Sequence, residues 1–161
     1  MTLGTCDRGP ASVIGLLQRV SRASVAVEDL TIAEIGAGLL VFVAVETGDT
    51  EAQAARLMER LLAYRVFADD RGRINLNVRE AGGSLLLVPQ FTLAADTRKG
   101  NRPGFSKAAP PALGRQLFDH MARLGTDAPV PVATGRFGAT MSIDLCNEGP
   151  MTFWLRVPPS G

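Results

Sequence analysis

The stretch Asn147-Glu148-Gly149-Pro150-Met151-Thr152-Phe153 lies near the C-terminal end of the sequence. Its first part is polar and ends in Gly149-Pro150. The apolar run 151–157 follows directly and predicts a final strand. Proline lacks an N–H and is tolerated at the first residue of a strand or on an edge, so the carbonyls around Gly149-Pro150 are expected to point away from the ladder. Two interpretations stay open: a tight turn, or backbone acceptors for a ligand.

Length and composition indicate one globular domain. The 161 residues suffice for a single well-buried core, and the hydrophobic (46%) and charged (20%) fractions are close to globular averages. A net charge of +1 excludes a strong general attraction to polyanions, so a nucleic-acid partner requires locally focused basic residues. We expect a flexible N-terminal extension at residues 1–12, punctuated by glycine and proline, and one domain at residues 13–158.

The cysteine and histidine content argues against a metal site. Cys6, Cys146 and His120 are the only residues of these two types, so a zinc-type ligand set cannot be assembled. Two distant cysteines fit reduced thiols in a cytoplasm better than a disulfide framework. The sequence has no basic, apolar leader pattern and no apolar run of the ~18–20 residues that a membrane span needs. We therefore expect a soluble cytoplasmic protein.

Hydrophobic periodicity predicts a sheet with two helices. An apolar stripe at three- and four-residue spacing predicts a helix from about residue 51 to 65, capped by Asp49 or Thr50. A second stripe predicts a helix from Pro110-Pro111 to Gly125, with His120 on its surface. Alternating or continuous apolar runs predict strands, with residues 75–83 between them left irregular. These runs are 13–20, 24–27, 31–35, 39–45, 84–93, 141–145 and 151–157.

Nucleophile elbows, P-loops and dinucleotide fingerprints are absent from the sequence, and this leaves a site made of backbone. Pro89 cannot donate to a ladder, so the strand is expected to loosen there and to expose the N–H groups of Gln90, Phe91 and Thr92. Such N–H groups can stabilise a developing oxyanion, and Thr92 adds a hydroxyl. The alternative is that Thr92 is an ordinary strand threonine.

A basic segment follows this strand. Arg98, Lys99, Arg102 and Lys107 occur within ten positions that hold no acidic residue and are interrupted by glycine and proline. The segment is either a solvated surface loop or a set of phosphate contacts, each of which would add to a salt-dependent affinity.

Several motifs together resemble the D-aminoacyl-tRNA deacylases, over residues 14–157 and in the same order. They are Gln18-Arg19-Val20, Arg22-Ala23-Ser24-Val25, Gly36-Ala37-Gly38-Leu39-Leu40, Asn75-Leu76-Asn77, Gly82-Gly83, Gln90-Phe91-Thr92-Leu93, Arg102-Pro103 and the opening stretch Asn147 to Phe153.

The resemblance implies a homodimeric α+β fold with barrel-like mixed or antiparallel sheets and two main helices. It implies hydrolysis of the ester that joins a D-amino acid to the 3′-terminal adenosine of tRNA, with glycyl-tRNA mischarged on alanine tRNA also accepted, and no metal or organic cofactor. The Gly149-Pro150 bond is expected to be cis and to reach across the dimer, where its carbonyls fix the substrate amino group. Arg19 supports this loop, and Asn147 and Met151 belong to the same substrate-binding motif.

For catalysis, the resemblance implies that residues 90–93 hold the scissile carbonyl and the adenosine through main-chain groups. Thr92 matches a threonine proposed as nucleophile; the alternative is assistance by the 2′-hydroxyl of the terminal ribose, which the scarcity of histidine favours. The basic residues Arg98, Lys99, Arg102 and Lys107 are expected to contact tRNA.

One position departs from the family pattern. Pro89 stands where these deacylases usually have serine, and this resembles a related branch that acts on tRNA misacylated with L-alanine. The opening stretch and Gln18-Arg19-Val20 nevertheless follow the D-specific pattern, so we expect D-specificity. The alternatives are an L-alanyl-tRNA deacylase, a non-catalytic tRNA-binding module and a hydrolase of small esters that uses Thr92.

Overall fold

The computed structural model describes residues 10–160, and its sheet is built around β1 (Val13–Val27). β1 pairs antiparallel with β2 (Leu30–Ile35), with β3 (Gly38–Ala44) and, along nearly its whole length, with β8 (Ser142–Val157). β6 (Ser84–Pro89) runs parallel to β3, and β7 (Val132–Thr134) runs parallel to β6. The sheet is therefore mixed, with the order β2-β1-β3-β6-β7 and β8 on β1.

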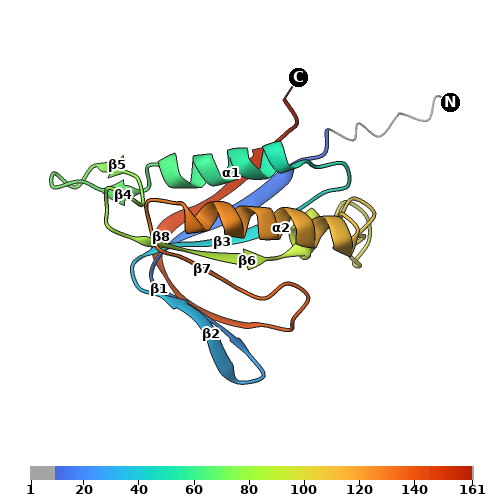
Figure 1. Cartoon of the computed structure of the whole chain (residues 1–161), viewed down its shortest axis with the longest axis horizontal. Helices are drawn as coiled ribbons and strands as arrows, with labels where there is room; N and C mark the ends of the chain where they lie inside the picture. The colour runs from blue at the N-terminus through green and yellow to red at the C-terminus, as the bar shows by residue number, and fades with distance from the viewer. Residues whose placement is uncertain (1–9, 161) are drawn as a thin grey trace.

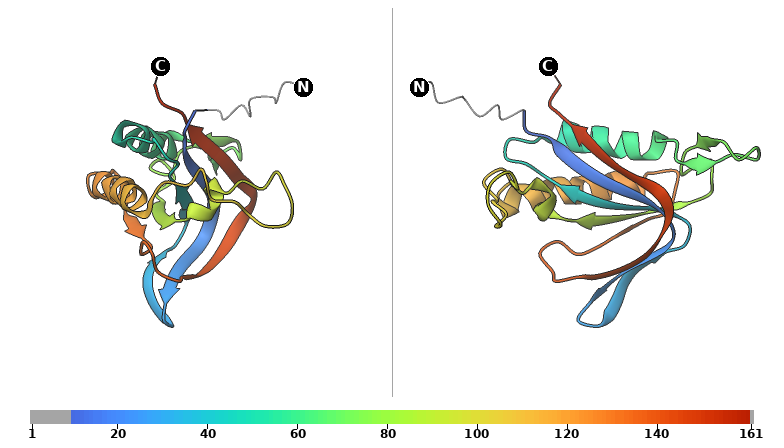
Figure 2. Two further views of the ribbon diagram at one scale, coloured as in Figure 1. Left: turned by 90° about the vertical axis from the view of Figure 1, so that its right-hand side faces the viewer. Right: turned by 180° about the vertical axis from the view of Figure 1, so that it is seen from behind.

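Strong twist curls this sheet into a nearly closed barrel, and α1 (Glu51–Ala63) and α2 (Pro111–Thr126) lie side by side over one of its faces (Figures 1 and 2). β4 (Phe67–Ala68) and β5 (Ile74–Leu76) form a small separate hairpin that projects beyond the end of α1 (Figure 1). The expected α+β fold with two main helices is confirmed. No helix among residues 10–160 is long and apolar enough to span a membrane.

The core lies between the helices and the sheet because each helix buries one apolar stripe. Leu57 and Leu61 of α1 and Leu117 and Met121 of α2 are at most 1% exposed, and they pack against buried strand residues such as Leu39, Leu85 and Leu87. Thr50 is the N-cap of α1 and forms a reciprocal capping box with Gln53, so Thr50 rather than Asp49 caps the helix.

The two early strands predicted at 13–20 and 24–27 are one continuous strand, β1, and the two predicted near the C-terminus are likewise one strand, β8. The register between β1 and β8 shifts twice, between Gln18 and Val20 and between Val20 and Arg22. Each bulge inverts the alternation of side chains, so a period-two pattern breaks although the strand continues.

Two other sequence predictions need correction. The strand expected at 84–93 ends at Pro89 and gives way to a 3₁₀ helix, η1 (Phe91–Ala94), as the missing proline donor requires. The segment 75–83, expected to be irregular, begins inside the short strand β5. Residues 1–9 of the expected extension 1–12 lie outside the described residues. Ser12 is 3% exposed and belongs to the folded body, so the extension ends before residue 12.

A buried polar cluster ties both chain ends to the helix layer. Glu46 accepts a hydrogen bond from the Ser12 N–H (2.8 Å) and an ion-pair contact from Arg156 (3.4 Å). Asp49 accepts from the Glu46 N–H (2.7 Å) and from Gln53 Nε2 (3.0 Å), which also donates to the carbonyl of Val157 (3.0 Å). Burial raises the pKa of Asp49 to about 6, although its hydrogen bonds oppose the shift.

This pKa predicts a pH-dependent stability that Asp49→Asn removes. The folded-state pKa lies above the unfolded value of about 3.9, so the folded state binds more protons between about pH 4 and 6 and its stability falls as pH rises through that window. We expect the free energy of unfolding of the wild type to fall relative to Asp49→Asn by on the order of 3 kcal/mol between pH 4 and 7. Urea denaturation at several pH values measures it; a pH-independent difference would contradict the assignment.

Candidate active site

Gly149 and Pro150 lie in a wide bulge of β8. Gln18 pairs with Thr152 and Val20 pairs with Asn147, so the four residues 148–151 of β8 stand opposite Arg19 alone. The surplus chain loops out of the ladder, and residues 147–150 are exposed. The Gly149–Pro150 peptide bond is cis, as the resemblance implies. The sequence interpretation as a turn between strands is thus replaced by an outward bulge inside one strand.

The side chain of Asn147 closes the base of this bulge. Its Nδ2 donates to the carbonyl of Arg19 on β1 (2.9 Å) and to the carbonyl of Met151 at the far end of the bulge (3.2 Å). A Cβ added to Gly149 would lie 3.4 Å from Asn147 Oδ1, so the amide occupies the inside of the loop. Beside it, Gln18 Nε2 donates to Thr152 Oγ1 (3.2 Å), and the outgoing strand is tied to β1 as well.

Met151 and Arg19 support the bulge from the protein side. Met151 is half-buried and packs against the main core, so its side chain anchors the loop to the helix layer. Arg19 Nη1 donates to the carbonyl of Val66, just before β4 (2.8 Å). The carbonyl of Arg19 accepts a hydrogen bond from the Asn147 side chain. The observed support by Arg19 therefore runs through its backbone, and its guanidinium fastens the neighbouring connection.

The segment 90–94 forms a second exposed backbone feature. The Gln90 N–H donates to the carbonyl of Val43 (2.8 Å), so it is not available to a ligand, and this corrects the expectation that all three N–H groups are exposed. Phe91 and Thr92 lie in the first turn of η1, where backbone donors lack intrahelical partners. The Gln90 side chain donates to Thr92 Oγ1 (2.6 Å), so the threonine hydroxyl is held by an amide rather than by a base.

An apolar pocket of about 530 Å³ opens beside this segment. Phe91 and Phe105 lie at its mouth, exposed by 58% and 42%, and their ring centroids are 5.2 Å apart. Among the described residues that line the pocket, none has a titratable side chain. They are Val43, Ala44, Val45, Thr47, Gln90, Phe91, Phe105, Ala108, Ala109, Pro110, Pro111, Gly114, Phe118, Phe137 and Gly138.

Sequence reasoning missed most of this pocket. Phe105 and Phe137 stand next to glycines in loops, and an aromatic residue flanked by glycine outside a periodic run is the signal that could have found them. The remaining lining residues are small or aliphatic and come from distant segments, so they carry no sequence signal of their own.

The basic segment is held by its ends and by one ion pair. Asp96 pairs with Gly104 in an isolated bridge, and Thr47 N–H donates to the carbonyl of Lys107 (2.9 Å). Arg98 binds the Asp96 carboxylate through Nε (2.8 Å) and Nη2 (2.5 Å), and this pair holds the pKa of Asp96 well below its usual range. Arg98, Lys99 and Arg102 are all exposed, and Arg98 is engaged within the loop by its ion pair with Asp96.

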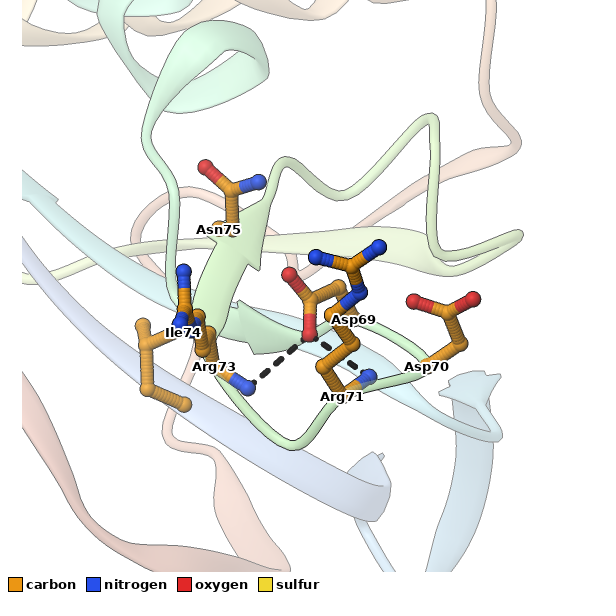
Figure 3. Close-up of a pocket in the computed structure, with 6 residues that line it drawn as sticks. All are labelled: Asp69, Asp70, Arg71, Arg73, Ile74 and Asn75. Carbon is orange, nitrogen blue, oxygen red and sulfur yellow. Dashed lines mark hydrogen bonds between the residues drawn. The ribbon is translucent and has the colours of Figure 1, made fainter.

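A polar hollow of about 540 Å³ lies at the β4–β5 hairpin, far from the segment 98–107, at the other end of the molecule (Figures 1 and 3). Asp69 Oδ1 accepts the N–H groups of Arg71 and Arg73, each at 2.9 Å, and these contacts close the hairpin turn. The hollow is therefore a consequence of the turn.

Within one chain the bulge and the segment 90–92 are separated. The bulge stands opposite Arg19, which pairs with Leu39, whereas Gln90 is bonded to Val43, which pairs with Gly15. The two levels are four residues apart along β1, or about 13 Å. The structure brings Arg19, Asn147, Gly149, Pro150 and Met151 together as one group and Gln90, Phe91 and Thr92 as another.

The geometry defines a protein that presents an apolar pocket beside an exposed segment of backbone. Residues 16–156 match the family D-Tyr-tRNA(Tyr) deacylase. The chain is 60% identical to a D-aminoacyl-tRNA deacylase of Thioalkalivibrio sulfidiphilus (strain HL-EbGR7), over 91% of this chain and 99% of that protein. It is 56% identical to a D-aminoacyl-tRNA deacylase of Herminiimonas arsenicoxydans, over 92% and 99%.

Among solved structures, the "c-Myc DNA Unwinding Element Binding Protein" has a TM-score of 0.84 at 32% identity, covering 91% of this chain and 99% of that one. The chain belongs to the D-Tyr-tRNA(Tyr) deacylase family. It is accordingly a hydrolase that acts on D-aminoacyl-tRNA.

The contacts of Asn147 predict that Asn147→Asp impairs the enzyme without unfolding it. Aspartate keeps the size of the side chain but turns two donors into an acceptor that faces two carbonyls. We expect kcat/KM for D-tyrosyl-tRNA to fall on the order of 100-fold, because small displacements of positioning groups have effects of that size. Asp144→Asn, on the same strand but in an exposed ion pair with Arg22, is the matched control. Equal activity of the two variants would contradict the role of Asn147.

Proposed function

We propose that the enzyme proofreads chirality as a homodimer, with the Gly149–Pro150 bulge of one protomer completing the site at residues 90–92 of its partner. The observation that carries this proposal is the separation of the two features by about 13 Å along β1 within one chain. The bulge is exposed and rigidly tied at its base, so it is suited to enter a neighbouring molecule.

The outer face of β1 and β8 supports such a dimer. Leu16 stands directly opposite Trp154, which is 48% exposed, and Gln18 and Thr152 continue the same face. An exposed tryptophan beside an aliphatic residue on the outer face of a sheet is typical of a protein interface. This face borders the bulge, so a partner on it would receive Gly149 and Pro150.

In this assembly the carbonyls of Gly149 and Pro150 accept hydrogen bonds from the α-amino group of the substrate. A D-amino acid directs its side chain away from the bulge, whereas an L side chain would point into the backbone, and glycine, which has no side chain, is accepted. Discrimination by steric exclusion at the backbone requires a loop that cannot move, and Asn147, Met151 and Arg19 supply that restraint.

The terminal adenosine occupies the apolar pocket, with its base against Phe91 and Phe105 and its ester over residues 90–92. The N–H groups of Phe91 and Thr92 bind the developing oxyanion. Because the described pocket lining offers no titratable side chain, the ribose 2′-hydroxyl of the tRNA assists the attacking water. Gln90 positions Thr92, and no metal or organic cofactor takes part in this proposal.

Contacts to the rest of the tRNA fall to the basic loop. Lys99, Arg102 and Lys107 approach phosphates, while Arg98, bound to Asp96, shapes the loop. We propose that one deacylase domain spans residues 13–158 and works in the cytoplasm, where aminoacyl-tRNA is used.

The proposal predicts that Gly149→Ala abolishes chiral proofreading in a folded protein. The added Cβ meets only Asn147 Oδ1 at 3.4 Å within the chain, so the variant should fold, but the methyl group crowds the bulge whose carbonyls hold the substrate amino group in this proposal. We expect wild-type enzyme to release D-tyrosine from D-tyrosyl-tRNA and to leave L-tyrosyl- and L-alanyl-tRNA intact. For Gly149→Ala, kcat/KM on the D-ester should fall on the order of 100-fold.

Gly36→Ala is the control, because a Cβ at Gly36 meets nothing within 4 Å. Unchanged kinetics of Gly149→Ala would contradict the proposal. A wild-type preference for L-alanyl-tRNA would move the protein to the branch that Pro89 resembles.

Backbone-mediated catalysis also predicts only a partial effect of Thr92→Ala. The N–H groups of residues 91 and 92 survive the substitution, so the loss in kcat should stay below about tenfold, or about 1.4 kcal/mol. Multiple-turnover release of D-tyrosine at saturating D-tyrosyl-tRNA measures kcat directly. Complete loss of activity would instead identify the Thr92 hydroxyl as the nucleophile.

A further inference from the structure

Arg115 lies beside three residues of the apolar pocket wall, Gly114, Phe137 and Gly138. It belongs to the second turn of α2, directly after Gly114, which lines the pocket and lies against Phe137: a Cβ at Gly114 would be 3.3 Å from the Phe137 ring. The Arg115 guanidinium carbon is 5.0 Å from the centroid of the same ring, and Nη2 lies 3.7 Å from the position of a Cβ at Gly138. The guanidinium therefore covers the outer side of the wall that Phe137 and Gly138 form.

This stacking fixes the guanidinium without using its hydrogen-bond donors. A cation over an aromatic face is attracted by the ring quadrupole, and this attraction leaves the N–H donors of the guanidinium available to a ligand. Arg115 is exposed, and the four ion pairs found among residues 10–160 do not include it, although Asp119 follows one turn later on α2. A charged donor held in place at the mouth of a pocket is prepared for an anion.

The pocket itself lacks charge, so the anion has to lie at its rim. The described lining residues have no titratable side chain, and they suit a base and a ribose better than a phosphate. A nucleotide whose base enters the pocket must leave its phosphate outside, next to whichever charged group stands at the mouth. On one side of the pocket, the wall includes Phe105 and Ala108, which stand on either side of Lys107 in the sequence. On the side of α2, the wall includes Phe137 and Gly138, and Arg115 lies next to them.

We propose that Arg115 binds the phosphate on the 5′ side of the terminal nucleoside and so fixes the direction in which the tRNA 3′ end leaves the pocket. This assignment rests on the proposed function, because it takes the pocket to hold the terminal adenosine. Arg115 acts on substrate binding and orientation and touches no reacting atom.

The test compares two small ligands on wild-type protein and on variants. Adenosine and 5′-AMP differ only by the phosphate, so the ratio of their dissociation constants isolates the phosphate contact. We expect wild-type protein to bind 5′-AMP about five- to tenfold more tightly than adenosine at low salt, as a charge-assisted contact at an exposed site allows. Arg115→Ala should bring the two ligands within about twofold of each other, and Arg115→Lys should give an intermediate ratio.

Arg123→Ala is the matched control, since Arg123 is exposed on the same helix two turns further on and away from the pocket lining. If Arg115 only stabilises the Phe137 wall, Arg115→Ala weakens adenosine and 5′-AMP equally, and the proposal is overturned. It is also overturned if the Arg123 variant lowers the ratio as much. Failure of wild-type protein to bind adenosine at all removes the pocket assignment itself, whereas adenosine binding with no preference for 5′-AMP rejects Arg115 alone.

Discussion

The pair of hydrogen bonds from the Asn147 side chain is the constraint on which the site depends. A bulge that sets four residues of β8 against one of β1 leaves backbone groups without ladder partners and would be free to change shape. The amide of Asn147, at one end of that loop, donates to the carbonyl of Arg19 on β1 and to the carbonyl of Met151 at the other end. The side chain of Met151 anchors that other end in the core. Gly149 and Pro150 are thereby presented as rigid backbone, which is what recognition without a side chain requires.

Rigidity at the bulge is inherited from the sheet. β1 is the common partner of β2, β3 and β8, and its first half is buried in the core next to α1, so the position of Arg19 is set by the core. The other half of the site is fixed through β6, whose end at Pro89 turns the chain into η1 beside Val43. The bulge and the segment 90–92 are therefore both positioned by β1, at different points along its length. In the proposed dimer, a second copy of the chain brings them together.

The sequence predicts the parts of this structure that depend on local chemistry. The helices follow from their apolar stripes and the Thr50 cap, and β3 follows from its continuous β-branched run. From the residues alone, Gly149-Pro150 is either a tight turn or a set of backbone acceptors, and only the resemblance to the deacylases favours the second. Two long-range features could not be predicted: the continuity of β1 and β8 through two bulges, and the hydrogen bond from the Gln90 N–H to the carbonyl of Val43. The ion pair between Arg98 and Asp96 could not be predicted either, because it depends on the conformation of the loop. The pocket is assembled from segments with ordinary apolar residues, so only the fold reveals it.

The most direct test of the central claim is complementation between two inactive variants in one dimer. Gly149→Ala damages the bulge, and Phe91→Glu puts a carboxylate into the apolar pocket. If the bulge acts across the dimer, a mixed dimer contains one site with an intact bulge and an intact pocket, and co-expressed, separately tagged protomers should recover about half of the wild-type release of D-tyrosine. If each protomer uses its own bulge, no mixed dimer holds an intact site, and absence of recovery in purified mixed dimers would contradict the account.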